Sequence, residues 1–276
     1  MDCTELTPTL GVEVHDLDAA LPLSAHDLAE LLANYDARHL LLLRGQCLDG
    51  EAQVRFVSMF GPLVRERSGD YGYVSNVRPD GVVREGALLF HSDFAFAAEP
   101  MLGLSLHAID VPDDGAPTLF ANAVRAVGLL PATMRERLEH TRIRNHFDFQ
   151  LPSDRRYRHH EMAPGSPVTE HPAIGVHPRT GAAVLNINEM HTECLVGMSE
   201  GESDELLAEV FSVLYAPSNV YEHRWSPGDL VVWDNVALHH GRRTVPVHEP
   251  RTLQRVALGN HTAEELVPNL AELLGR

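Results

Sequence analysis

Cysteine is scarce in this chain of 276 residues, and its three copies lie far apart at Cys3, Cys47 and Cys194. An odd number without close spacing excludes a disulfide framework and offers no thiolate pair for a metal. The sequence also has no apolar run of membrane-spanning length, and residues 1–5 lack the basic start and apolar stretch of a signal peptide. We therefore expect a protein of the reducing cytoplasm that does not bind a membrane.

Positive charge is also in short supply. Lys and Arg number 22 against 39 Asp and Glu, which gives a formal net charge of −17 and argues against a nucleic-acid partner. A hydrophobic content of 44% over 276 residues is enough for one sizeable core, and the sequence shows no repeat or linker. We expect a single domain spanning residues 1–276.

His91 and Asp93 form a His-x-Asp triplet, and His240 lies far downstream of it. Together these three residues predict a metal site. Side chains at i and i+2 of a strand project to the same face, so His91 and Asp93 can grip one ion while Ser92 points away. Two imidazoles and one carboxylate are the ligand set of non-haem Fe(II) oxygenases, in which half of the iron's coordination sphere stays open. For the triplet alone, an exposed polar strand is the alternative, because the chain has 17 His and 39 acidic residues.

Two arginines follow His240 in a segment of strand composition. Arg255 stands fifteen positions beyond His240 and Arg251 four before Arg255, so both should face the same way. A guanidinium in a concave site is a bidentate receptor for a carboxylate, and two side by side repel each other unless anions bind there. The pair predicts a site for acidic small molecules; surface arginines on a hairpin are the alternative.

Several short segments occur in the order and spacing typical of one enzyme family. They are Leu41-Leu42-Leu43-Arg44-Gly45-Gln46, Phe56, Phe60-Gly61, Phe90-His91-Ser92-Asp93, Gly115-Ala116-Pro117-Thr118-Leu119-Phe120, His171-Pro172, His177-Pro178, Thr180-Gly181, Asn188-Glu189, Ser226-Pro227-Gly228-Asp229, and Trp233-Asp234-Asn235 leading to His240 and the two arginines. Through them the chain resembles the Fe(II)- and 2-oxoglutarate-dependent dioxygenases of the taurine dioxygenase (TauD/TfdA) family. The resemblance covers most of the chain and fades near residues 65–87 and 140–165.

The resemblance implies roles for individual residues. His91, Asp93 and His240 match the metal ligands, which we also interpret as the catalytic centre. Thr118 and Arg251 match the residues that hold the distal carboxylate of 2-oxoglutarate, and Arg255 matches an arginine that engages an acidic substrate. The implied cofactor is Fe(II), with 2-oxoglutarate and O2 as cosubstrates. His239 competes with His240 for the third ligand position, but adjacent strand residues face opposite ways, and the spacing selects His240.

The chain departs from the family pattern around the substrate rather than around the metal. His191 falls where an aromatic wall residue is expected, and Ala87 falls where taurine-specific enzymes carry an amide. The loop over residues 65–76 does not align on the His and Tyr used for a sulfonate, so taurine is not the expected substrate. Phe94 is expected to line the pocket, with a place in the core as the alternative. Asp93 itself disfavours the halogenating relatives, which carry a small residue there.

The hydrophobic pattern, read with the resemblance, predicts a mainly β fold with flanking helices (α+β) around a double-stranded β-helix, a cupin-like jelly roll that begins near Leu88. Segment 142–169 is expected to be an irregular insert, either a lid or a disordered surface loop. Expected strands cover residues 10–17, 39–44, 102–109, 118–122, 173–177, 183–187, 219–225, 230–234 and 251–258. Expected helices cover residues 24–36, 50–60, 123–138 and 203–215, and a turn covers 111–115.

From this family likeness we expect an enzyme that hydroxylates, or otherwise oxidises at C-H, a small carboxylate-bearing metabolite and releases succinate and CO2. The expected partner is a small anionic molecule bound between Arg255, His191 and Phe94, and the protein could form a homo-oligomer. A cupin-like metal-dependent isomerase or small-molecule sensor is one alternative. A hydroxylase of a protein or carrier-bound substrate is the other, although the acidic balance offers no obvious docking face.

Overall fold

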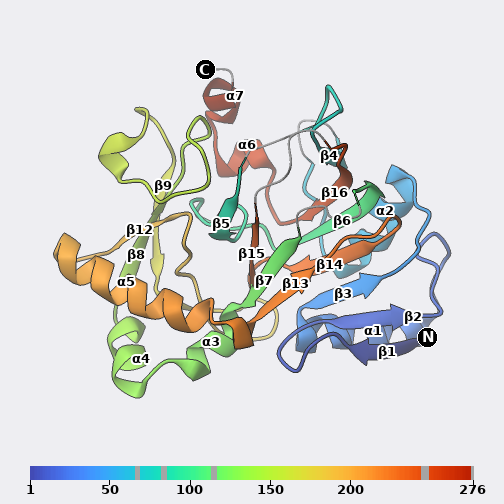
Figure 1. Ribbon diagram of the computed structural model, residues 1–276, viewed down its shortest axis with the longest axis horizontal. Coiled ribbons are helices and arrows are strands. Elements are labelled where there is room, and N and C mark those ends of the chain that lie inside the picture. Colours follow the sequence, from blue (N-terminus) through green and yellow to red (C-terminus); the bar gives the residue numbers. More distant parts are fainter. Residues whose placement is uncertain (66–68, 82–85, 113–116, 244–248, 275–276) are drawn as a thin grey trace.

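Two antiparallel sheets dominate the computed structural model, which describes residues 1–276 except 66–68, 82–85, 113–116, 244–248 and 275–276 (Figure 1). The larger sheet has the order β1 (Asp2–Glu5), β2 (Val12–His15), β3 (Leu40–Leu43), β14 (Leu230–Asp234), β6 (Gly103–Asp110), β16 (Thr252–Leu258) and β4 (Gly72–Ser75), with only β2 and β3 parallel. The smaller sheet has the order β13 (Val220–His223), β7 (Thr118–Asn122), β15 (Leu238–Arg242) and β5 (Leu88–His91).

The space between the two sheets holds one hydrophobic core. Leu104, Val231 and Trp233 of the larger sheet pack there with Phe120 and Leu238 of the smaller one. Because successive side chains of a strand alternate between faces, Leu230 and Val232 of β14 point instead to a second core on the outer face of the larger sheet.

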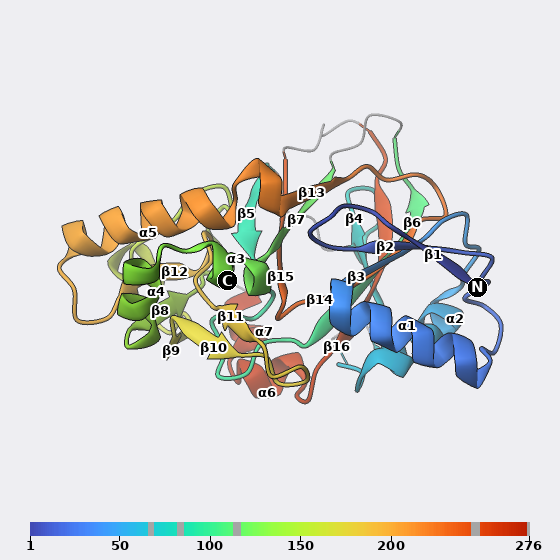
Figure 2. The ribbon, with the colours of Figure 1, turned by 90° about the horizontal axis from the view of Figure 1, so that it is seen from below.

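Helices α1 (Ala25–Arg38) and α2 (Gly50–Val57) cover that outer face (Figure 2). Each begins at a side-chain cap: Ser24 accepts from the Asp27 amide, and Asp49 accepts from the Ala52 amide. Leu31 and Phe56 bring their buried faces onto the sheet. The 3-10 helix η1 (Ser58–Phe60) extends α2, so the predicted helix over residues 50–60 is confirmed with a tighter last turn.

A helical layer packs beside the smaller sheet, at the left of Figure 1. It comprises α3 (Ala123–Leu129), α4 (Ala132–Glu139), α5 (Glu200–Leu214) and the short η2 (His159–Glu161) and η3 (Pro217–Asn219). Two small sheets join it, one of β12 (Thr192–Leu195), β8 (Arg142–His146) and β9 (Val168–Pro172), the other of β10 (Ile174–Val176) and β11 (Ala183–Leu185). The chain then ends in α6 (Ala263–Leu266) and α7 (Leu270–Leu274).

The mainly β fold with flanking helices is confirmed, and the two facing sheets are not closed into one barrel. Strands predicted at residues 118–122 and 230–234 are observed with those bounds. The described helices include none long and apolar enough to cross a membrane. Part of the predicted turn at 111–115 and of the 65–76 loop lies outside the described residues, although the latter segment contains β4.

Three predictions about elements were wrong. The helix expected over residues 123–138 is two helices, because Pro131 cannot continue the first one. Segment 142–169 is irregular only in its middle, since its ends form β8 and β9, which pair with each other. The large sheet also begins long before Leu88, because β3 pairs directly with β14 and brings β2 and β1 with it.

Candidate functional site

Three side chains from distant parts of the chain meet on the inner face of the smaller sheet. His91 at the end of β5 and His240 on β15 are cross-strand neighbours, so their side chains share this face. Asp93 Oδ1 lies 3.2 Å from His91 Nε2 and 3.6 Å from His240 Nε2. One ligand atom from each residue lies within 4.8 Å of the other two, which is a separation that one metal ion can bridge. The side chains are only 9%, 21% and 13% exposed for His91, Asp93 and His240.

Hydrogen bonding and burial leave these groups suited to metal binding. His91 Nδ1 donates to the Leu89 carbonyl oxygen at 2.8 Å, which leaves the lone pair of Nε2 for the site. Burial lowers the pKa of His240 to about 3, so its ring is neutral. Burial alone would raise the pKa of Asp93, but its close contacts with His91 and His240 lower it to about 2. The Nε2 atoms of both histidines therefore face a carboxylate anion.

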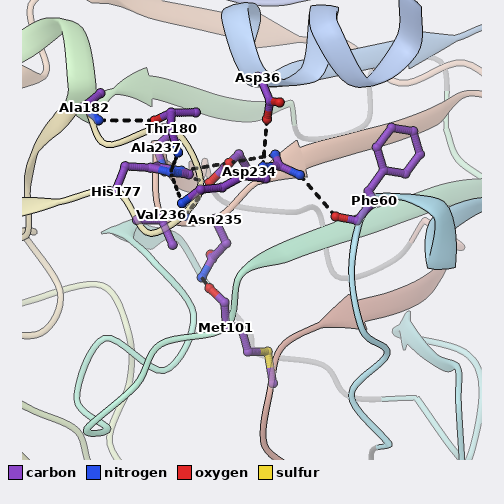
Figure 3. A network of polar contacts seen from close by, with 11 residues as sticks. Asp36, Phe60, Met101, His177, Thr180, Ala182, Asp234, Asn235, Val236 and Ala237 are labelled. Atoms are coloured by element: carbon purple, nitrogen blue, oxygen red, sulfur yellow. Dashed lines mark hydrogen bonds and ion pairs between the residues drawn. The ribbon is translucent and has the colours of Figure 1, made fainter. Parts of the chain in front are cut away.

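Asp93 does not reach the site as part of a strand, so the strand argument for it was wrong. Strand β5 ends at His91, and Asp93 opens a turn. Asn235, just after β14, holds this turn from both sides: its Oδ1 accepts from the Asp93 amide at 2.9 Å, and its Nδ2 donates to the Asp93 carbonyl at 3.1 Å. The same amide group donates to the Met101 carbonyl at 2.8 Å (Figure 3). Phe94 next in the turn has a φ of 60°, which non-glycine residues rarely adopt.

Arg255 contacts the second oxygen of the same carboxylate. Its Nη2 lies 2.8 Å from Asp93 Oδ2, whereas Oδ1 faces the two histidines. Arg255 comes from β16 of the opposite sheet, where Leu253 and Ala257 on either side of it face the shared core. Burial lowers the pKa of Arg255 to about 10, a value at which it stays cationic at neutral pH.

A second group of polar side chains lies farther along the same inner face. Thr118 of β7 pairs across the sheet with Arg242 of β15, two residues beyond His240. Arg251 directly precedes β16, four residues before Arg255, and lies close enough to Arg242 for their charges to interact. All three are buried, and burial lowers the pKa of both arginines to about 10, with Arg242 lowering that of Arg251 further. Two mutually repelling buried cations beside a hydroxyl form a receptor for an anion.

Aromatic side chains border the metal-ligand cluster. The ring of His191 stands edge-on to His91 with centroids 5.7 Å apart, and it contacts Phe96 and Phe147 at 5.0 Å each. Phe94 packs against Phe96 at 5.3 Å. Burial and the nearby His91 hold the pKa of His191 well below its ordinary value, so this residue is a neutral wall. Helices α6 and α7 supply the apolar backing of this aromatic cluster.

Two other residues considered in the sequence lie outside the ligand cluster. His239 faces away from His240: its Nδ1 lies 3.1 Å from the Tyr215 hydroxyl, and burial lowers its pKa to about 3. Ala87 precedes β5 and is half-buried.

Sequence reasoning gave no role to three residues that shape the site, namely Asn235, Arg242 and Trp225. Arg242 could have been found from its spacing, because it follows His240 by two positions in a strand. The indole of Trp225 donates to the Thr118 hydroxyl at 3.0 Å, a contact across the sheet that no local pattern signals.

The fold and the site together define a class of protein. Two facing antiparallel sheets hold a His, Asp and His cluster at one end of their shared core and buried arginines beside it. Such a ligand set leaves half of an octahedral metal's positions open for small molecules and O2.

The chain belongs to the family described as taurine catabolism dioxygenase TauD, TfdA family, whose model matches residues 2–257. It is an Fe(II)- and 2-oxoglutarate-dependent dioxygenase, as the sequence predicted. The alternative of a cupin-like isomerase or sensor is set aside.

Curated relatives and solved structures match this chain over most of its length. An (S)-phenoxypropionate/alpha-ketoglutarate-dioxygenase of Sphingobium herbicidovorans is 28% identical, with 96% of this chain and 95% of the relative covered. An alpha-ketoglutarate-dependent 2,4-dichlorophenoxyacetate dioxygenase of Cupriavidus pinatubonensis is 31% identical, with 86% and 91% covered. The structure of AAD-2 in complex with Mn(II) and N-oxalylglycine superposes with a TM-score of 0.80 at 25% identity, covering 93% of this chain and 97% of the other. The predicted jelly-roll core is confirmed by these neighbours.

Proposed function

We propose that His91, Asp93 and His240 hold Fe(II), and that Arg251 and Thr118 hold the distal carboxylate of 2-oxoglutarate. The observation that carries the first assignment is the convergence of three ligand atoms within 4.8 Å, with His91 Nε2 kept free by the bond of Nδ1 to a carbonyl. The second rests on Arg251, whose buried Nε has no hydrogen-bond partner in the described part of the chain. With Fe(II), 2-oxoglutarate and O2 bound, the reaction oxidises a C-H bond of the substrate and releases succinate and CO2.

The protein's own residues orient the reactants. Arg255 holds one oxygen of Asp93 and so turns the other toward the histidines. Asn235 fixes the turn that carries this carboxylate. The aromatic cluster of Phe94, Phe96 and Phe147 keeps water from one side of the site.

For the primary substrate we propose a small molecule with a carboxylate and an apolar body. Arg255 lies against the metal-ligand cluster and is cationic, so it can receive the carboxylate. His191 and Phe94 offer an uncharged aromatic surface to the rest of the molecule. Relatives named for phenoxypropionate and 2,4-dichlorophenoxyacetate support this choice, because both compounds join an aromatic ring to a short acid.

We further propose that residues 1–276 act as one catalytic domain. Strands β14 and β16 support this, because each contributes side chains to both hydrophobic cores.

The metal assignment is tested without oxygen. Adding Fe(II) and 2-oxoglutarate to the metal-free protein should produce the weak visible charge-transfer band of a chelated keto acid in the wild type. The His240→Ala variant should not produce it, whereas His239→Ala, which removes the neighbouring histidine that faces away, should retain it. A band of unchanged strength in His240→Ala would contradict the assignment.

The role of Arg255 is tested by pairing each trial acid with its neutral methyl ester, starting with phenoxyacetate, and measuring succinate release. The wild type should prefer the acid, and Arg255→Ala should lose that preference by about tenfold or more, since a charge-assisted bond contributes roughly 1.5–3 kcal/mol. Because Arg255 also holds Asp93, a general loss of activity is expected for both compounds, and only their ratio reports substrate binding. The exposed Arg224→Ala is the control. An unchanged ratio would contradict the assignment.

A further inference from the structure

The deepest part of the proposed 2-oxoglutarate site contains a hydrogen bond whose direction is fixed by chemistry. Trp225 Nε1 lies 3.0 Å from Thr118 Oγ1, and both residues are only 5% exposed. An indole N-H can donate but cannot accept, so the threonine oxygen must be the acceptor.

This direction decides what the Thr118 hydroxyl can offer to a ligand. The indole occupies one of its acceptor lone pairs, so its single O-H must point elsewhere. Among the residues that the structure describes, no group accepts a hydrogen bond from Thr118 Oγ1. A hydroxyl polarised in this way is a ready donor beside two buried cations, Arg242 and Arg251, and all three features favour an anion.

The indole of Trp225 packs against a buried histidine. Its ring meets the edge of His223 with centroids 4.5 Å apart at 88°. His223 is fully buried; its Nε2 lies 3.2 Å from Asp229 Oδ2, and its Nδ1 lies 3.1 Å from the Tyr221 hydroxyl. Asp229 is anchored in turn by Arg44 at 2.8 Å and by the Ser226 amide at 2.9 Å. A chain of buried contacts therefore runs from Arg44 at the surface to the Thr118 hydroxyl.

We propose that Trp225 is a positioning residue for the cosubstrate: by donating to Thr118, it orients the threonine hydroxyl as a donor to the distal carboxylate of 2-oxoglutarate. The inference rests on the proposed binding of that carboxylate by Thr118 and Arg251. It gives a buried core residue a part in the preference for 2-oxoglutarate over keto acids that lack the distal carboxylate.

The test compares two keto acids that chelate a metal identically. 2-Oxopentanoate has the keto acid of 2-oxoglutarate without the distal carboxylate. Anaerobic titrations of the Fe(II) protein, followed by the charge-transfer band, give a Kd for each. In Trp225→Phe we expect about three- to tenfold weaker binding of 2-oxoglutarate, which corresponds to loss of part of one hydrogen bond. The Kd of 2-oxopentanoate should stay unchanged.

A double-mutant cycle shows whether Trp225 acts through Thr118. Thr118→Val should itself weaken 2-oxoglutarate binding, and adding Trp225→Phe to it should cause no further loss, because the hydroxyl that the indole orients is already absent. Tyr73→Phe is the matched control: it removes an aromatic hydroxyl that contacts Gln254, on the larger sheet away from this site, and should change neither Kd.

The possible failures are distinguishable. If Thr118→Val binds 2-oxoglutarate as the wild type does, the carboxylate assignment itself is wrong and the inference falls with it. If Thr118→Val weakens binding but Trp225→Phe does not, the assignment holds and the positioning role is refuted. If Trp225→Phe weakens both keto acids equally, or adds its full effect to Thr118→Val, the indole is only a packing residue and the inference is also overturned.

Discussion

At the scale of single residues, Asn235 holds the turn that carries Asp93, one of the three proposed metal ligands. It is fully buried, and its one amide group serves three backbone groups, the N-H and C=O of Asp93 and the C=O of Met101. A strand would have fixed the side chain of Asp93 through its ladder. Since Asp93 lies in a turn, this fixed position comes from Asn235 instead.

Replacing Asn235 should therefore loosen the metal site. In Asn235→Ala we expect Fe(II) affinity to fall by about tenfold or more, because groups that orient metal ligands have effects of that size. Stability should fall by roughly 1–3 kcal/mol, since buried backbone groups lose their partners. Titration calorimetry with Fe(II) or Mn(II) and urea unfolding measure the two effects. Asn34→Ala removes an asparagine amide that bonds within α1 and is the control. Unchanged metal affinity would show that the turn holds its shape alone.

At the scale of elements, the connection from β14 to β15 is held by one buried carboxylate (Figure 3). Asp234 Oδ2 lies 2.9 Å from His177 Nε2 and 3.4 Å from Arg179 Nη2, and its Oδ1 accepts from the Val236 and Ala237 amides at 3.0 Å each. This turn carries Asn235 and leads into the strand of His240. The network thus joins the hairpin of β10 and β11 to the strands that build the site.

Replacing Asp234 should lower the free energy of unfolding. In Asp234→Asn the amide can still accept from the backbone, but the negative charge that His177 and Arg179 contact is lost. We expect a loss of about 1–3 kcal/mol in the free energy of unfolding, measured by urea denaturation, because buried polar groups lose a charged hydrogen-bond partner. Asp36 also contacts Arg179, at 2.7 Å, but is 42% exposed, so Asp36→Asn should cost less than about 1 kcal/mol. Equal losses for the two variants would contradict this account.

At the scale of the whole molecule, buried histidines link stability to pH. Burial lowers the pKa of His107, His146 and His171 below the ordinary value of 6.5. The unfolded chain therefore takes up protons near pH 6.5 that the folded protein does not bind until a lower pH. Stability from this source is fully present above pH 6.5 and is lost as the pH falls below it.

We expect the metal-free protein, kept with a chelator, to become less stable as the pH falls from 7.5 to 5.5. Urea unfolding at several pH values measures this. His107→Asn should reduce the slope, whereas His26→Gln, at a side chain that is 88% exposed, should not. Stability that is constant or higher at pH 5.5 would refute the linkage.

Much of the architecture could be read from local patterns. Strands β7 and β14 and the caps of α1 and α2 follow from alternation and side-chain chemistry that act within a few residues. Pro131 also indicates a helix end, although the helix predicted over residues 123–138 runs through it. The pairing of β8 with β9 lies across an irregular stretch of some twenty residues, and no local signal marks it.

The amino-acid sequence alone identifies the groups of the proposed site, namely the two histidines, the carboxylate and the arginines, and their order along the chain. Their spacing matches that of the family, which made them recognisable. Three features emerge only in the folded protein: how Asp93 is held, that Arg255 shares its carboxylate, and that Trp225 turns the Thr118 hydroxyl. The contacts of Asn235, Arg255 and Trp225 join residues more than one hundred positions apart. They form only when distant strands have paired and the two sheets have packed together, so no pattern of neighbouring residues contains them.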